Sequence, residues 1–172
     1  MAGQLLPSYQ TIAGAWVLDL NRSDTMEGYL NCLGTPNVVI QAQIAGEQAQ
    51  ESRNVIALDE SAMVMHKRTR VNNFTETYEL GEEKFTPTRL GGRRSTAALR
   101  NWGRLDGFMI TSTFTSEAGD VMAVETRQLL NQGLAHFQEI TLTNVTTGDH
   151  HVTRRLWVRV PMTELDSAEL QG

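Results

Sequence analysis

Apolar and polar side chains alternate along most of this chain with a period of two residues, which is typical of strands that bury one face. Nine segments alternate in this way or are rich in strand-forming residues: 12–20, 54–60, 61–71, 74–80, 95–100, 104–114, 121–130, 134–145 and 152–160. Turn residues such as Gly91-Gly92 and Thr147-Gly148-Asp149 stand between them. About ten short strands joined by turns predict an all-β antiparallel meander. A sheet of that size without edge protection closes most naturally into a barrel.

Residues 23–50 break the period of two. Their apolar side chains recur at helical intervals of three and four residues: Met26, Tyr29, Leu30 and Leu33. Ser23 or Asp24 is a candidate N-cap, Gly34 ends this helix, and Pro36 begins a second one. The sequence therefore predicts a closed ten-stranded antiparallel up-and-down barrel, with a helix-turn-helix lid between strands 1 and 2.

The chain of 172 residues is long enough to bury one core without disulfides, and it contains one cysteine, Cys32. We expect a single barrel over residues 12–160, an N-terminal extension at 1–11 and a C-terminal tail at 161–172. The first thirty residues contain no apolar run of signal-peptide quality. No stretch reaches the apolar length that spans a bilayer. We therefore expect a cytoplasmic protein.

The net charge of −5 hides a basic middle third. Residues 66–104 contain nine Lys and Arg against four acids. One interpretation is a patch for an anionic membrane or an acidic protein partner. The other is solvated hairpin faces. We expect no nucleic-acid partner.

Motifs of catalysis and metal binding are missing from the sequence. None of the four histidines stands at a metal-ligand spacing, and there is no nucleophile elbow, phosphate loop or dinucleotide fingerprint. Cys32 lacks a flanking charge that would activate it, so we interpret it as a packing residue. The sequence predicts no enzyme, no metal and no cofactor.

The last predicted strand has two unlike faces. Arg155, Trp157 and Arg159 share one face, whereas Leu156, Val158 and Val160 share the other. Alternation alone does not decide which face looks inward.

Five stretches of the chain carry a family resemblance: GAWVL at 14–18, MEGYLNCLG at 26–34, NFTETYELGEEKF at 73–85, RRSTAAL at 93–99 and RRLW at 154–157. In this order they resemble the intracellular lipid-binding proteins, the fatty-acid-binding protein family of the calycin superfamily. The resemblance covers residues 12–160 and implies a lidded barrel with a ligand inside. Secreted lipocalins share Gly-x-Trp but usually bring a signal peptide and disulfides, so they are the second choice among barrels.

The resemblance implies that Arg155 and Trp157 point into the cavity and hold a ligand carboxylate. Trp157 replaces the tyrosine of the family, and its indole N–H can still donate to a carboxylate oxygen. The simplest alignment of strand 121–130 places Val124 and Thr126 inward and Arg127 outward, although a one-residue bulge would reverse this. Three further residues complete the expected ligand site: Met26, Leu30 and, at the portal, Val71.

Two functions follow from these observations. The first is a cytosolic carrier that binds a fatty acid or similar hydrophobic anion inside the barrel, with its carboxylate at Arg155. The alternative is a scaffold barrel with a filled or vestigial cavity, docked in a larger assembly through the aliphatic outer face of Leu156 and Val158.

Overall fold

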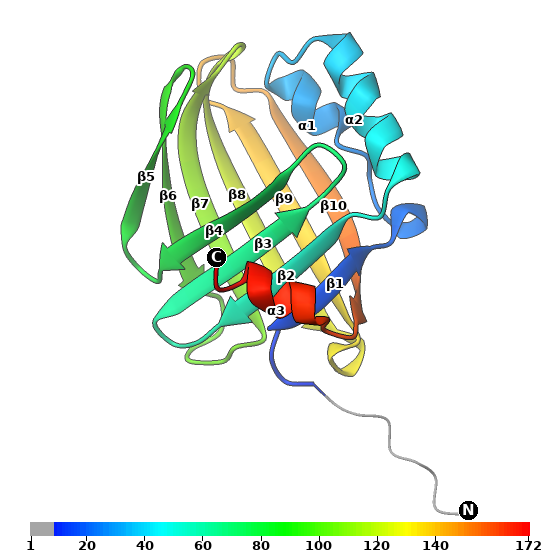
Figure 1. Cartoon of the computed structure of the whole chain (residues 1–172). Helices are drawn as coiled ribbons and strands as arrows, with labels where there is room; N and C mark the ends of the chain where they lie inside the picture. The colour runs from blue at the N-terminus through cyan, green and yellow to red at the C-terminus, as the bar shows by residue number, and fades with distance from the viewer. Residues whose placement is uncertain (1–8) are drawn as a thin grey trace, which may run out of the picture.

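The structure is a computed structural model that describes residues 9–172, so most of the predicted N-terminal extension lies outside the described residues. Ten strands and three α-helices follow one another (Figure 1): β1 Gly14–Leu18, α1 Glu27–Cys32, α2 Asn37–Ala49, β2 Arg53–Leu58, β3 Ala62–Arg68, β4 Asn73–Glu79, β5 Glu83–Thr88, β6 Gly91–Leu99, β7 Gly107–Ser116, β8 Gly119–Leu130, β9 Ala135–Asn144, β10 His150–Val160 and α3 Glu164–Glu169. Short 3₁₀ turns occupy Leu20–Arg22 and Asn131–Gly133.

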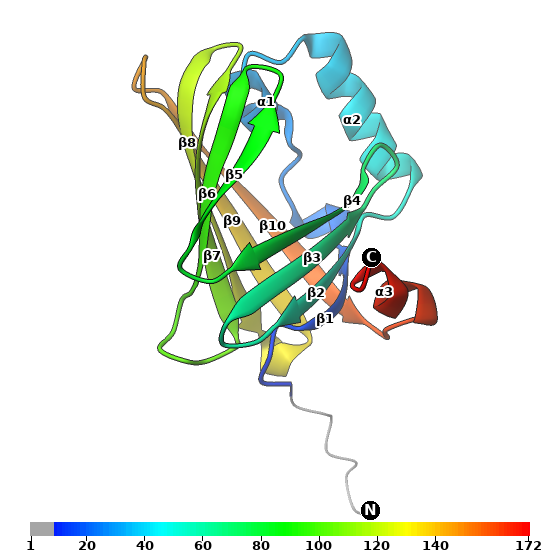
Figure 2. The same ribbon diagram turned by 60° about the vertical axis from the view of Figure 1, so that its left-hand side comes forward.

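All ten strands form one antiparallel sheet in the order β4-β3-β2-β1-β10-β9-β8-β7-β6-β5. The first strand β1 pairs with the last strand β10, so β4 and β5 are the two ends of the sheet. These ends diverge in Figure 2. Lys84 Nζ of β5 donates to the Thr77 carbonyl of β4 at 2.9 Å. The predicted ten-stranded barrel is confirmed, and its ring is open only between these two strands.

The predicted helix-turn-helix lies between β1 and β2 and covers the upper end of the barrel (Figure 1). Gly34 adopts a φ of +74° between the two helices, and a Cβ there would come within 3.0 Å of the Ala118 backbone. The predicted N-caps were wrong, because Ser23 and Asp24 accept hydrogen bonds from the β10 backbone instead of capping α1. These bonds fasten the start of the lid to the barrel wall.

The larger apolar core fills the lower part of the barrel around Trp16, which is fully buried. Arg159 closes this end, because its guanidinium donates to the carbonyls of Thr11, Ala13 and Gly133 and lies 4.3 Å from the Trp16 ring centroid. The barrel is therefore sealed below, and its free space lies toward the lid.

The C-terminal helix α3 packs on the outside of β2 and β3 (Figure 2). Its Asp166 is fully buried and accepts from Arg53 Nε at 2.9 Å and Arg68 Nη2 at 3.1 Å. Helix α1 packs against β10. No helix among residues 9–172 is long and apolar enough to cross a membrane.

Candidate ligand-binding site

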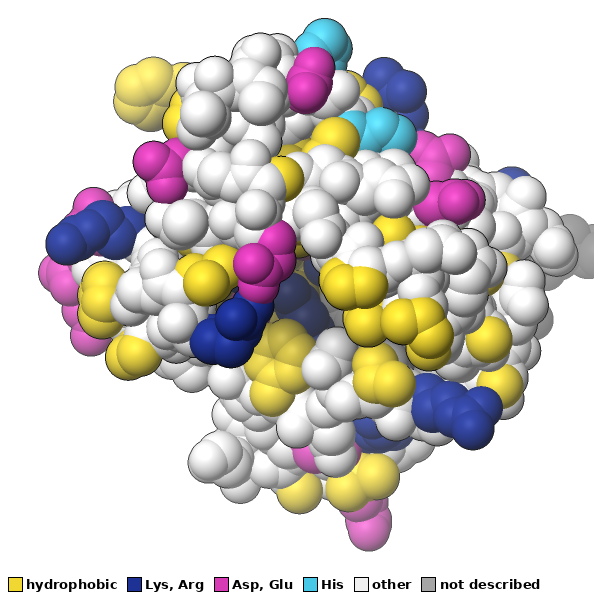
Figure 3. Space-filling model, turned by 90° about the horizontal axis from the view of Figure 1, so that it is seen from above, with side chains coloured by type: hydrophobic (Ala, Val, Ile, Leu, Met, Phe, Trp, Pro, Cys, Tyr) yellow, Lys and Arg dark blue, Asp and Glu magenta, His cyan; other side chains and the backbone are white. Residues whose placement is uncertain are grey.

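A cavity of about 230 Å³ opens beneath the lid helices. Side chains of α1, α2 and at least seven strands line it, and most of those side chains are polar. The view from above shows a hollow with Lys and Arg side chains inside it (Figure 3). Four cations line the cavity against two carboxylates: Lys67, Arg93, Arg127 and Arg155 against Glu47 and Glu125. An anion is the ligand charge that this lining favours.

The structure brings three of the predicted site residues to the cavity: Met26, Arg155 and Trp157. Arg155 and Trp157 are each 4% exposed. The cationic and aromatic face of β10 therefore looks inward at these two residues. Their contact with a ligand stays a prediction.

The predicted orientation of β8 was wrong. Val121, Ala123 and Arg127 are buried, and Glu125 and Arg127 line the cavity, whereas Val124 and Thr126 lie on the opposite face. Pairing with β9 is continuous from Val121 to Leu130, so no bulge is involved. Both faces of this strand carry apolar residues, so alternation could not decide which one faces the cavity.

Leu30 and Val71 are not among the residues that line the cavity. Leu30 is half-buried on α1, and its neighbour Tyr29 lines the cavity instead. Val71 is 63% exposed in the β3–β4 turn. Its place at a portal remains a prediction, since Asn72 beside it does line the cavity.

A hydrogen-bonded network joins the inward side chains of β8, β9 and β10. The Trp157 indole donates to Gln138 Oε1 at 2.8 Å, and Gln138 Nε2 donates to Glu125 Oε1 at 2.9 Å. Arg127 Nε donates to the same oxygen at 2.7 Å. The indole N–H that we expected to serve a ligand carboxylate is therefore already used by Gln138.

Charges within this network are fixed by their neighbours. Burial alone would raise the pKa of Glu125, but the cations Arg127 and Lys67 outweigh it and lower the pKa to about 2. Burial and the charges of Arg127 and Arg159 hold the pKa of His136 well below its usual value. His136 is therefore neutral at pH 7, and its Nε2 lies 3.3 Å from Arg127 Nη1.

Arg155 has both a partner and free donors. Its Nη2 donates to Glu47 Oε1 of the lid helix α2 at 2.6 Å. Its Nε and Nη1 are buried and have no hydrogen-bond partner among the described residues. A buried N–H without an acceptor is costly, so two donor positions of this guanidinium are available to a ligand.

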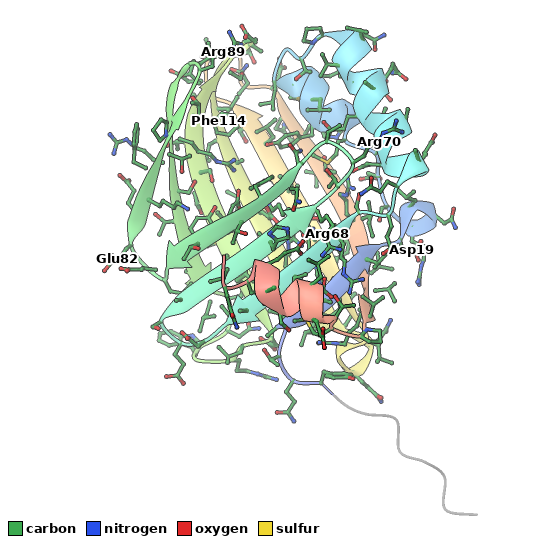
Figure 4. The ribbon with its side chains drawn as sticks, in the orientation of Figure 1. Asp19, Arg68, Arg70, Glu82, Arg89 and Phe114 are labelled. Atoms are coloured by element: carbon green, nitrogen blue, oxygen red, sulfur yellow. The ribbon has the colours of Figure 1, made fainter. Side chains whose placement is uncertain are left out.

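The basic residues of the middle third do not gather into one outward patch. Lys67 and Arg93 line the cavity. Arg68 instead forms an ion pair with Glu169 of α3 and lies close to that helix (Figure 4). Arg89 and Arg94 form ion pairs with Glu117 and Glu83. An anionic partner for this segment stays a prediction.

Sequence reasoning missed five charged cavity residues: Glu47, Lys67, Arg93, Glu125 and Arg127. Glu125 and Arg127 share a face because they are two residues apart, which was a readable signal. No signal in the sequence marked Glu47 as a cavity residue, because its partner Arg155 is 108 residues away. No group of His, Cys, Asp and Glu among residues 9–172 could hold a metal ion.

The lidded ten-stranded barrel, open between β4 and β5 and hollow beneath two helices, has the fold of the fatty-acid-binding proteins. Three of the solved structures that are similar to this chain illustrate the match. A Schistosoma mansoni fatty acid binding protein in complex with arachidonic acid shares 18% identity at a TM-score of 0.63, covering 90% of this chain and 99% of its own.

The other two structures match to the same degree. The Caenorhabditis elegans lipid binding protein 8 shares 17% identity at a TM-score of 0.64, with 86% of this chain and 94% of its own covered. The REP1-NXSQ fatty acid transporter shares 16% identity at a TM-score of 0.63, with 88% and 98% covered. No protein-family model and no curated protein sequence matches the chain.

Proposed function

We propose that this protein is a cytosolic, non-enzymatic carrier that binds a fatty acid or similar hydrophobic anion in its cavity, with the ligand carboxylate at Arg155. The observation that carries the proposal is the pair of buried, unpartnered donors on Arg155, Nε and Nη1, in a cavity lined by more cations than carboxylates. The proteins of similar structure are named as fatty acid transporters, fatty acid binding proteins and lipid binding proteins.

Arg155 and the apolar lining have different tasks in this proposal. A charge-assisted hydrogen bond contributes about 1.5–3 kcal/mol, and each buried methylene contributes about 0.8 kcal/mol. Contacts along the chain therefore set most of the affinity, whereas Arg155 sets the orientation of the ligand. A cavity of about 230 Å³ favours a ligand of modest size, since pockets for drug-sized ligands span about 300–1,000 Å³.

The test compares Arg155→Gln with the wild type in binding a fluorescent fatty acid and the methyl ester of the same probe. We expect the variant to bind the acid about ten- to a hundredfold more weakly and the ester nearly unchanged. Arg154→Gln is the matched control, because Arg154 is the next residue, lies on the outer face and pairs with Glu139.

Equal losses for the acid and the ester would show that Arg155 has a structural role only. If the wild type binds neither probe and native mass spectrometry finds no small molecule on the purified protein, the carrier proposal fails. The scaffold alternative would then be preferred.

A further inference from the structure

Three of the four cations that line the cavity already have a carboxylate partner. Arg155 pairs with Glu47 at 2.6 Å, Arg127 pairs with Glu125 at 2.7 Å, and Lys67 Nζ lies 3.4 Å from Glu76 Oε2. Arg93 is the fourth. No carboxylate of residues 9–172 comes within ion-pair distance of it.

Arg93 is held in place by uncharged neighbours. Its Nη2 donates to Ser112 Oγ at 3.3 Å, and its guanidinium lies 5.2 Å from the Phe114 ring centroid. Its Nε is buried and has no partner among the described residues. A half-buried cation in a cavity, without a counter-ion and with a free donor, is suited to an anionic group of a ligand.

Arg93 and Arg155 lie at different levels along the paired strands of the barrel. The pairing of strands places Arg93 level with Phe114 and Val121, and Arg155 level with Gln138 and Arg127. The Arg93 guanidinium itself reaches Ser112, which pairs with Ala123. Ala123 and Arg127 are four residues apart on β8, which corresponds to about 13 Å at Cα level. Phe114, labelled in Figure 4, lies in the upper part of the barrel beneath the lid end.

The wall between these two levels is partly apolar. Ile110 and Ile140 line the cavity there on β7 and β9, and Glu125 of β8, which is paired with Arg127, lies between them. The cavity therefore offers guanidinium donors at two levels along the strands, with apolar contacts between them.

We propose that Arg93 is a second anion-binding residue and that the preferred ligand is a two-headed lipid acid, an apolar chain with an acidic group at each end. One acid binds Arg93 and the other binds Arg155. This inference rests on the proposed carrier function and adds the class of ligand that the cavity selects.

The test measures the binding of decanedioic acid and decanoic acid by calorimetry. Hexadecanedioic acid and hexadecanoic acid are compared in the same way as a second chain length. The two acids of a pair have the same number of carbons, so they differ only in the second head. At one chain length or both, we expect the wild type to bind the diacid about tenfold or more tightly than the monoacid. Arg93→Gln should remove this preference, and Arg93→Lys should keep part of it.

Arg94→Gln is the matched control, since Arg94 is exposed on the outer face of the same strand and pairs with Glu83. It should retain the full preference for the diacid. The inference is overturned if the wild type prefers the diacid at neither chain length, or if Arg93→Gln retains the preference. The wild-type comparison decides the first point even if a variant fails to fold.

Failure of the carrier function looks different. If neither acid of either pair binds the wild type, the proposed function falls and takes this inference with it. If monoacids bind through Arg155 but diacids bind no more tightly, only the role of Arg93 is lost.

Discussion

Arg127 is among the largest side chains that the barrel buries completely, at 1% exposed. Its guanidinium donates to Glu125, approaches His136 and binds Asn54 Oδ1 at 2.8 Å, so it joins β8 to β2 across the interior. The simplest alignment of this strand predicted a surface arginine, and the apolar residues Met122 and Val124 on the outer face did not argue against it. The charge pattern Glu125-x-Arg127 was the better guide to the inward face.

Arg127→Gln should lower the free energy of unfolding by about 3–5 kcal/mol, because it leaves the Glu125 carboxylate in the cavity without its ion-pair partner. Urea unfolding at pH 7 measures this loss. Adding Glu125→Gln to the variant should restore part of the stability, since the uncompensated charge is then removed. Arg154→Gln breaks an exposed pair and should cost about 1 kcal/mol or less. A similar small loss for Arg127→Gln would contradict a structural role for this network.

At the scale of the element, α3 is a six-residue helix that is held almost entirely by charge. Asp166 completes a capping box with Thr163 and also receives Arg53 and Arg68, while Glu169 pairs with Arg68. Burial opposes the charged form of Asp166, but the hydrogen bonds from Arg53 and Thr163 outweigh it and keep its pKa below the usual value. These ion pairs therefore fasten α3 to β2 and β3.

Asp166→Ala should cost about 2 kcal/mol of stability at pH 7, because it removes charge-assisted hydrogen bonds and the capping box together. Urea unfolding measures the loss. Glu164→Gln, an exposed change in the first turn of the same helix, should be nearly neutral. If the two variants behave alike, α3 contributes little to the fold.

The contribution of Asp166 should depend on pH in a defined direction. A carboxyl whose pKa is lowered on folding stabilises the native state above its unfolded pKa of about 3.9, and the stabilisation is lost as the pH falls below that value. The stability difference between wild type and Asp166→Asn should therefore be constant from pH 7 to about pH 5 and shrink toward pH 3. A stability difference that grows on acidification would contradict stabilisation by the charged form of Asp166.

At the scale of the whole molecule, β4 and β5 are the two ends of the sheet. Lys84 spans the gap by donating to Thr77, and its Nζ also lies 5.0 Å from the Tyr78 ring centroid. These side-chain contacts replace the backbone ladder that joins every other pair of neighbouring strands. They leave the backbone groups on two strand edges without a strand partner.

Amide hydrogen exchange should reflect this opening. Amides of β4 and β5 that point into the gap should exchange well before those of β9, which is paired on both sides by β8 and β10. Nuclear magnetic resonance of the exchanging amides measures the difference. Uniform protection around the ring would mean that β4 and β5 pair in solution.

The barrel and its lid could be predicted because their signals are local. Alternation marks each strand, and Gly34 and Pro36 separate the two helices. Arg155 could be placed because residues 154–157 resemble the last strand of the fatty-acid-binding proteins. Glu47, Arg93 and the network around Gln138 could not be placed, because each depends on contacts between strands far apart in the sequence.

The ion pairs inside the cavity also bear on whether the chain needs a ligand in order to fold. Three cations of the interior are neutralised by carboxylates of the same chain, so burying them does not require a foreign anion. A newly made chain can therefore fold before any ligand arrives. Under the proposed carrier function, loading with a ligand is then a step separate from folding.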